Sequence, residues 1–176
     1  MTHPDILAAR HLIAALGLRI SATAPETQNA AYGASVSEVG CGRVRFRVGK
    51  RTPAKPGLFV SVWQRAGDGS TEPFAAEDGI DLLVITVGEQ SRVGQFVFPR
   101  HALVEHGIVS VAGRGGKRGF RVYPPWSATQ NKQARHSRKW QSAYSLDLEN
   151  IDSRLARSLY EPILTSAVPS HNGDMR

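Results

Sequence analysis

The chain has 176 residues, 41% of them hydrophobic, which suffices for one domain with its own core and argues against global disorder. Its 22 Lys and Arg residues outnumber 15 Asp and Glu residues, and the net charge of +7 indicates an anionic partner such as nucleic acid or an acidic membrane surface. A single cysteine, Cys41, excludes an internal disulfide and a cysteine-based zinc site, and no segment approaches the roughly 20 apolar residues that span a bilayer. We therefore expect a soluble, cytoplasmic protein without membrane contact.

The first predicted element is a helix from Asp5 to about Ala15, which Gly17 ends. A loop or short second helix follows over residues 21–31. Alternating and continuous apolar patterns then predict strands at 43–48, 58–65, 78–87, 94–99, 109–113 and 119–125, with a short helix at 101–106.

The composition turns helical again over residues 128–148, and a last helix is predicted over 152–160. These elements predict an α+β fold with a mixed five- or six-stranded sheet flanked by N- and C-terminal helices. Residues 1–164 are expected to form a single domain, and the polar residues 165–176 a flexible tail.

Charge is segregated along the chain into two basic windows and one acidic window. Seven basic residues and no acid lie between Glu38 and Asp68, and eight more, again with no acid, lie between Glu105 and Asp147. Residues 68–89 hold six acids and no base. This pattern favours one positive face that meets an anionic partner. The alternative is that the windows neutralise each other across a sheet.

Three stretches of the basic windows combine cations with glycine, proline or aromatic residues. GKRTPAKPG at 49–57 holds its cations in a proline-fixed loop that suits phosphate contacts, or is only a solvated connector. AGRGGKRGFRV at 112–122 resembles cationic glycine segments that bind nucleic acid, or is a flexible hairpin loop. NKQARHSRKWQ at 131–141, on a helix, places several cations on one surface for a phosphate backbone, with Asn131 and Gln133 placed to read base edges.

Nucleic acid is accordingly the expected partner. The residues expected to bind nucleic acid are Lys50, Arg51, Lys55, Arg65, Lys117, Arg118, Arg121, Lys132, Gln133, Arg135 and Lys139. Trp126 and Trp140, which lie among these cations, more typically anchor a basic helix to the core than stack on bases.

The acidic window places Asp78 at the edge of a predicted buried strand and Asp81 within it. A carboxylate in such a strand is costly unless it is paired or metal-bound. The two carboxylates are therefore candidate Mg²⁺ ligands, and the alternative is that each bonds to a loop or to an arginine. The sequence shows no Ser/His/Asp set and no HExxH motif, so neither acyl transfer nor a zinc site has support.

Several longer stretches resemble the MepB family of bacterial proteins. In order over residues 28–148 they are FRVGKRTPAKPGLFVSVWQR, PFAAEDGIDLLVITV, GQFVFPRHALVEHGI, GKRGFRVYPPW and NKQARHSRKWQ. The resemblance implies a fold similar to restriction-endonuclease-like PD-(D/E)XK nucleases, with DNA binding as the leading activity and double-stranded DNA as the expected form of the nucleic acid.

Residue by residue, the resemblance also implies where a nuclease centre would lie. Such a centre needs an aspartate on one strand and a (D/E)xK motif on the next, to hold Mg²⁺ and activate water. Asp81 matches the aspartate, whereas Gln95 stands where the second acid is wanted. The Glu–Ser pair that the family usually carries before Tyr32-Gly33-Ala34 is here Gln28-Asn29.

Two acid-to-amide changes favour a DNA-binding protein on a nuclease-like fold whose catalytic residues have degenerated. One alternative is a Mg²⁺-dependent endonuclease, with Asp81 and Gln95 as catalytic residues and Asp78 and Asp81 as metal ligands. A second alternative is a regulatory module that binds an acidic protein partner.

Overall fold

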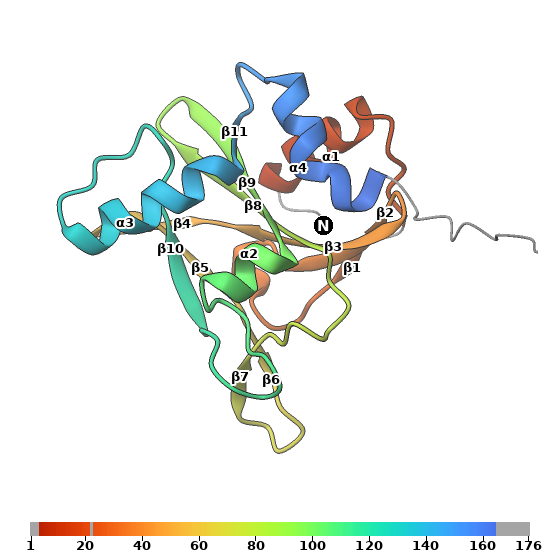
Figure 1. Ribbon diagram of the computed structural model, residues 1–176, viewed down its shortest axis with the longest axis vertical. Coiled ribbons are helices and arrows are strands. Elements are labelled where there is room, and N and C mark those ends of the chain that lie inside the picture. Colours follow the sequence, from red (N-terminus) through yellow and green to blue (C-terminus); the bar gives the residue numbers. More distant parts are fainter. Residues whose placement is uncertain (1–3, 22, 165–176) are drawn as a thin grey trace, which may run out of the picture.

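The computed structural model describes residues 4–21 and 23–164, so the tail expected over residues 165–176 lies outside the described residues. Its main sheet has six strands in the order β1–β2–β3–β8–β9–β11 (Figure 1). These strands are β1 (Ala24–Pro25), β2 (Ser35–Val39), β3 (Gly42–Val48), β8 (Leu82–Glu89), β9 (Arg92–Pro99) and β11 (Ser145–Asp147). Neighbouring strands are antiparallel except β3 and β8, which run parallel.

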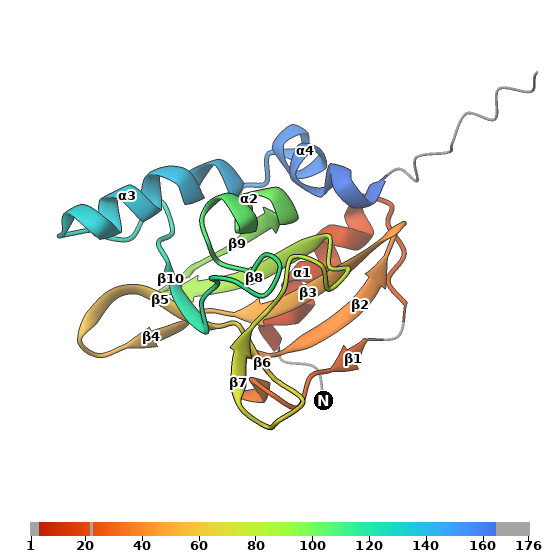
Figure 2. The ribbon, with the colours of Figure 1, turned by 60° about the horizontal axis from the view of Figure 1, so that its bottom comes forward.

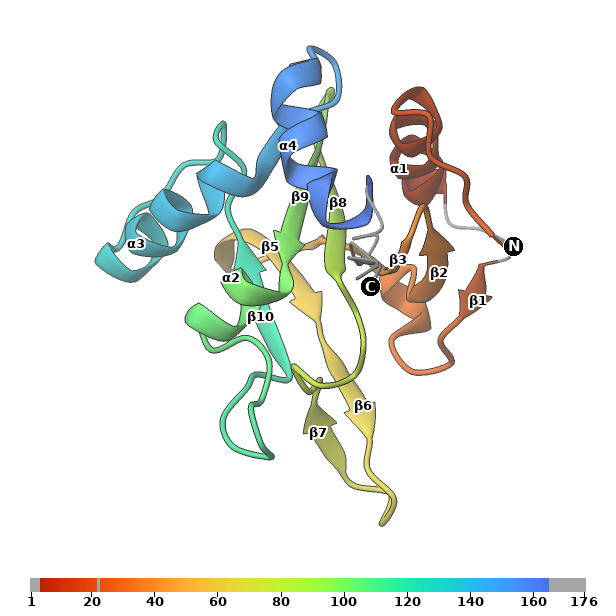
Figure 3. The ribbon, with the colours of Figure 1, turned by 45° about the vertical axis from the view of Figure 1, so that its right-hand side comes forward.

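Two smaller sheets lie beside the main sheet. The first has the order β10–β5–β4 and consists of β4 (Lys50–Thr52), β5 (Lys55–Ser61) and β10 (Gly119–Val122). The second pairs β6 (Trp63–Arg65) with β7 (Thr71–Pro73). This β6–β7 hairpin projects from the body of the molecule (Figures 1 and 3).

The helices and the small sheet cover the two faces of the main sheet. On one face, α1 (Pro4–Ala15) and α4 (Ser153–Leu164) pack on apolar side chains such as Val84. On the other face, α2 (Arg100–Glu105) and the β10–β5–β4 sheet bury Leu83 and Ile85, with α3 (Lys132–Gln141) at the outer side of this core. Because successive strand residues point to opposite faces, the unbroken apolar run of β8 reflects burial on both sides.

The expected α+β fold with a mixed sheet and terminal helices is confirmed, and three local elements differ from expectation. The helix predicted over 128–148 ends at Gln141, and residues 145–147 instead form β11, because Leu146 pairs with Gln95 along β9 and is buried there. Residues 109–113 form only isolated bridges and no strand. The predicted loop 49–57 contains β4, which pairs with β5.

Two short 3-10 helices complete the described elements, η1 (Ala30–Tyr32) and η2 (Ser142–Tyr144). The part of the chain that the structure describes contains no helix with the length and apolar character needed to cross a bilayer.

Candidate nucleic-acid interface

A groove of about 750 Å³, called here the α3 groove, lies between α3, β10 and the turn that joins β4 to β5. Figure 2 shows α3 on the same side of the molecule as that turn. The groove is lined by Lys55 from the first basic window and by Lys117 and Arg121 from the second. None of the described residues that line it is acidic. The fold therefore brings parts of both windows to one cavity without a carboxylate.

Helix α3 forms one wall of the groove. Its N-cap is Asn131, whose side-chain oxygen accepts a hydrogen bond from the backbone N–H of Ala134 at 2.7 Å. Gln133, His136 and Trp140 follow at helical spacing and so share one face, and all three line the groove. The wall is thus polar and aromatic rather than cationic.

The cations of α3 lie on the opposite flank of the helix. Arg135 and Lys139 line a separate hollow of about 380 Å³ together with Arg138. Lys132 is exposed, and it lies three and seven residues from Arg135 and Lys139, on their side of the helix. The structure therefore does not place these three predicted phosphate-binding cations in the same cavity as Lys55 and Lys117.

Trp140 and Trp126 are anchors, as expected. Trp140 packs on Phe98 with ring centroids 5.3 Å apart, and His106 stacks on it at 3.8 Å and 11°. Trp126 packs partly buried against the same core, with the guanidinium of Arg92 4.9 Å from its ring. Packing against the core therefore holds both indole rings.

Two of the predicted phosphate-binding arginines hold loops in place. Arg121 donates to the backbone carbonyls of Pro56 and Gly57 at 3.2 and 3.3 Å, and so fixes the start of β5. Arg118 donates to the carbonyl of Thr71 at 2.9 and 2.7 Å and so ties the segment before β10 to β7. Both side chains keep a positive charge at the surface while their geometry is set by these bonds.

Few of the cations that were predicted to bind nucleic acid form ion pairs. Within the described part of the chain, only Arg51 of that set forms an ion pair, with Glu89 at 3.7 Å. Lys55 and Lys117 are exposed, and their ammonium groups have no carboxylate partner among the described residues.

Two arginines of β3, Arg45 and Arg47, behave differently, because their side chains turn into the protein. Arg45 and Arg47 are only 9% and 0% exposed. Glu26 pairs with both, at 3.2 and 2.6 Å, and Asp78 pairs with Arg45 at 2.7 Å. The Arg45 guanidinium lies 3.7 Å from the ring centroid of Phe74. Burial lowers the pKa of Arg47 to about 10, although the neighbouring Glu26 carboxylate opposes this shift. Arg45 thus has a partner in the acidic window, Asp78, as the alternative of mutual neutralisation expects, whereas Glu26, the partner of Arg47, lies outside that window.

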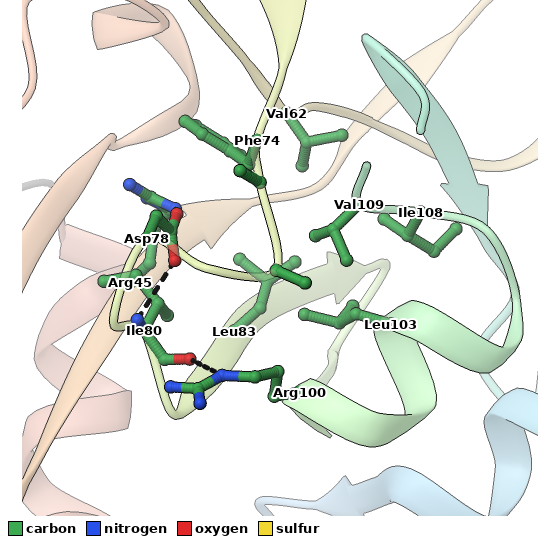
Figure 4. Close-up of a pocket in the computed structure, with 12 residues that line it drawn as sticks. Arg45, Val62, Phe74, Asp78, Ile80, Leu83, Arg100, Leu103, Ile108 and Val109 are labelled. Atoms are coloured by element: carbon green, nitrogen blue, oxygen red, sulfur yellow. Dashed lines mark hydrogen bonds and ion pairs between the residues drawn. The ribbon is translucent and has the colours of Figure 1, made fainter. Parts of the chain in front are cut away.

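Arg45 and Asp78 also border a small cavity of about 20 Å³ between β8, α2 and the segment before β10 (Figure 4). Leu83 and Leu103 are among its apolar lining residues. Figure 4 shows Arg100 at the same border, where its Nε donates to the carbonyl of Ile80 at 3.0 Å. This volume holds about one water molecule, so the cavity is too small for a substrate.

Asp81 was expected within a strand, but it lies in the segment just before β8, which begins at Leu82. Its Oδ2 accepts a hydrogen bond from the backbone N–H of Arg43 at 2.9 Å, and its Oδ1 pairs with Arg100 at 3.3 Å. Asp81 thus joins the start of β3 to the start of α2.

Gln95 lies in the middle of β9, in register with Thr86. It is 1% exposed, and its Oε1 accepts a hydrogen bond from the Tyr160 hydroxyl at 3.1 Å. Thr86 follows Asp81 by five positions, which is about 16 Å of strand. The structure therefore does not bring the expected catalytic pair together, because Asp81 precedes the first pair of the β8–β9 ladder and Gln95 lies near its middle.

The expected magnesium site does not fit these residues either. Asp78 and Asp81 are each paired with an arginine, and Asp78 also accepts a hydrogen bond from the backbone N–H of Ile80. No group of three His, Cys, Asp or Glu placed to hold a metal ion occurs among residues 4–21 and 23–164. Since both carboxylates already neutralise guanidinium groups and Gln95 is remote, no cleavage step follows from this arrangement.

Asn29, the second of the two amides at positions where the family usually has Glu–Ser, also has a structural role. Its backbone is left-handed, with φ of 64°, and its Nδ2 donates to the carbonyl of Trp63 at 2.8 Å. Its side-chain oxygen accepts a hydrogen bond from the Ser61 hydroxyl. Asn29 thereby fixes η1 against the junction of β5 and β6.

A second hollow, of about 580 Å³, was not anticipated from the sequence. It is lined by the half-buried rings of Tyr32, Phe59 and Trp63, together with Arg118. We call the three rings and this hollow the ring face. A signal for it exists in LFVSVWQR, because Phe59, Ser61 and Trp63 alternate with buried aliphatic residues and so share the outer side.

The fold and the α3 groove define a small α+β protein with a basic groove that no described acidic residue lines. A family model described as MepB-like matches residues 26–147, and the chain belongs to this family. It is similar to the crystal structure of MepB, with 30% sequence identity and a TM-score of 0.73, over 84% of this chain and 99% of that chain.

A bacterial homing endonuclease, I-Ssp6803I, matches with 11% identity and a TM-score of 0.46, over 76% of this chain and 83% of that chain. A TM-score below 0.5 does not establish a shared fold. None of the curated proteins compared with the chain matches it.

Proposed function

We propose that the chain binds nucleic acid, and double-stranded DNA in particular, through the α3 groove. The observation that carries the proposal is that both basic windows contribute cations to one groove lined by no described acidic residue. Exposed lysines without ion-pair partners suit a phosphate backbone, because their contact with phosphates releases condensed counterions.

The walls of the groove suggest a division of roles. Lys55 on the β4–β5 turn and Lys117 before β10 would contact phosphates and set the position of the duplex. Gln133 on α3 carries an amide of the kind that pairs with adenine in the major groove. Arg121 supports the Lys55 wall through its bonds to the β4–β5 turn.

The cations on the other flank of α3 extend the positive surface beyond the groove. Arg135 and Lys139 line their own hollow beside Arg138, so they would contact phosphates that lie outside the groove. Binding that involves about eight phosphates loses several decades of affinity between roughly 50 and 200 mM salt.

The test is a fluorescence anisotropy titration of a blunt duplex of about 20 base pairs over that salt range. The double variant Lys55→Ala/Lys117→Ala is expected to reduce the salt slope by about 2, since each lysine releases about one counterion. Because phosphate contacts carry no sequence information, the loss of affinity is expected to be similar for different duplex sequences.

The matched control is Arg154→Ala/Arg157→Ala, which removes the same charge from exposed positions on α4. Helix α4 belongs to the core on the other face of the main sheet, so the control is expected to leave the slope unchanged. Equal slopes for both double variants, or an affinity that hardly changes with salt, would contradict the proposal.

A further inference from the structure

The outer side of the β10–β5–β4 sheet carries a row of rings and cations. Lys50 of β4, Phe59 of β5 and Arg121 of β10 are in register, so they lie side by side across the three strands. Leu58 and Val60 are buried in the core, and Phe59 between them points to the opposite, outer side. The row therefore faces away from the core.

Two further rings extend this row. Tyr32 packs edge-on against Phe59, with ring centroids 6.1 Å apart and an interplanar angle of 68°. Trp63 lies four residues beyond Phe59 and lines the same hollow of about 580 Å³. The Phe59 ring occupies the place that a side chain on Gly119 would take, so glycine at this position lets the ring lie across β10. A hollow of this volume is in the range of small-ligand sites.

Each of the three rings has a cation near its face. The Nζ atom of Lys50 lies 5.1 Å from the ring centroid of Tyr32. The guanidinium carbon of Arg65 lies 5.2 Å from the Trp63 ring, and that of Arg121 lies 5.9 Å from the Phe59 ring. No described residue that lines the hollow is acidic. The surface thus pairs flat apolar groups with positive charge.

We propose that the ring face binds the unpaired bases of a single-stranded nucleic acid. Bases would stack on Tyr32, Phe59 and Trp63, while Lys50, Arg65 and Arg118 would contact the phosphates between them. A duplex hides the faces of its bases, so aromatic stacking of this kind requires an unpaired strand. An acidic peptide would use the charges but leave the rings without a partner.

The ring face adjoins the α3 groove. Gly119 lines both cavities, and Arg121 lines the groove while its guanidinium lies near Phe59. A duplex in the groove and an unpaired strand on the ring face would therefore meet along β10. The inference deepens the proposed function, on which it rests for the class of ligand, by adding a site for the single-stranded part of a junction.

The first test uses the wild-type protein and two labelled ligands of about 15 nucleotides, an oligothymidylate and an abasic strand with the same phosphates. Both ligands carry the same charge, and only the first carries bases. Because stacking on an aromatic side chain strengthens binding per base, the oligothymidylate is expected to bind roughly 5- to 100-fold more tightly. Equal affinities would overturn the proposal.

The second test uses Trp63→Ala/Tyr32→Ala, with Trp63→Phe as the conservative variant. The double variant is expected to weaken oligothymidylate binding roughly 5- to 100-fold, and Trp63→Phe to retain affinity within about threefold. The salt slope is expected to stay unchanged, because the phosphate contacts remain. Circular dichroism checks the fold of each variant, and the abasic comparison does not depend on the variants.

A blunt duplex separates this proposal from the one before it. Duplex affinity is expected to change by no more than about twofold in the double variant, because duplex binding depends on Lys55 and Lys117 instead. If the double variant loses duplex affinity and single-strand affinity equally, the rings have only a structural role. If polyglutamate displaces the labelled strand as strongly as unlabelled oligothymidylate does, the surface binds any polyanion and does not recognise bases. Either result overturns the ring-face proposal. Loss of salt-dependent duplex binding, by contrast, contradicts only the α3 groove.

Discussion

Two arginines of β3, Arg45 and Arg47, and the lysines of the α3 groove belong to the same pattern in the sequence but have opposite environments. Arg45 and Arg47 are buried and paired with Glu26 and Asp78, whereas Lys55 is exposed and has no such partner among the described residues. This difference shows that cation density in a sequence does not identify a binding surface. A cation is available to a ligand only when no carboxylate from elsewhere in the chain pairs with it.

The physical reason is the cost of burying charge. A guanidinium removed from water loses several kcal/mol of hydration free energy, which only well-placed partners offset. Glu26 and Asp78 lie 19 and 33 residues from Arg45 and supply that compensation through the fold. Cations at the surface keep their hydration, so they can remain unpaired until an anionic ligand arrives.

The largest expected change in stability comes from removing a carboxylate that pairs with the buried arginines. Glu26→Gln removes the carboxylate that pairs with both Arg45 and Arg47, and leaves the Arg47 guanidinium buried with its charge uncompensated. We expect the free energy of unfolding to fall by roughly 3–5 kcal/mol, measured by urea denaturation. Glu38→Gln is the control, because Glu38 and its partner Arg43 are exposed, and its expected cost is below about 1 kcal/mol. Similar losses of unfolding free energy in both variants would contradict the expectation that the buried ion pairs stabilise the fold more than the exposed pair does.

The next prediction tests whether Gln95 is a core residue or a catalytic position at which an acidic residue has been replaced. Gln95→Glu places a carboxyl group in a site that is 1% exposed, where burial is expected to raise its pKa above the value of about 4.3 in the unfolded chain. The variant is then as stable as the wild type below about pH 4 and loses stability as the pH rises, by about 3 kcal/mol at pH 7. Denaturation at both pH values measures this loss. Gln90→Glu, at an exposed turn, is the control and should cost almost nothing.

The same variant addresses the nuclease alternative. Since Asp81 precedes the first pair of the ladder and Gln95 lies near its middle, we expect Gln95→Glu to gain no Mg²⁺-dependent cleavage of plasmid DNA. Cleavage that appears with Gln95→Glu and disappears on Asp81→Ala would restore the catalytic pair.

The smallest effect concerns the hydrogen-bond partner of Gln95. Tyr160→Phe removes the hydroxyl that donates to Gln95 Oε1, and we expect a loss of about 1–2 kcal/mol in the free energy of unfolding. Burial raises the pKa of Tyr160 above its usual range, so the folded state keeps this proton where the unfolded chain loses it, near pH 10. Wild-type stability should therefore fall as the pH rises past about 10, and the variant should fall less steeply.

Urea denaturation at about pH 7 and pH 10.5 measures that difference. Tyr144→Phe serves as the control at neutral pH, because the Tyr144 hydroxyl forms no hydrogen bond with any described residue, and its expected cost is below about 0.5 kcal/mol. Parallel alkaline slopes for wild type and Tyr160→Phe would contradict the expected role of this buried hydroxyl.

Local sequence patterns predicted much of the fold. The helical spacing of residues 5–15 predicted α1, and the apolar runs that contain Leu83 and Val97 predicted β8 and β9. β11 and β4 escaped prediction because each has three residues and exists only through pairing with a distant neighbour. Such pairing produces no hydrophobic periodicity within the segment itself.

The candidate sites divide in the same way. The sequence indicated that cations gather around residues 49–57 and 112–141, and Lys55 and Lys117 do line one groove. It did not indicate that Arg135 and Lys139 face the other flank of α3, because the rotation of a helix is set by what it packs against. The ring face was readable only in part, through the alternation of Phe59 and Trp63.

The sequence alone predicted the fold class and the excess of positive charge, because these follow from composition and from short-range periodicity, and its longer motifs indicated the family by resemblance. Only the tertiary structure decided which cations are buried, which face the groove, and which lie beside Tyr32 and Phe59. It also separated Asp81 from Gln95. The physical reason is that the environment of a charge depends on its neighbours in space, and strand register and helix rotation fix those neighbours only when the whole chain packs.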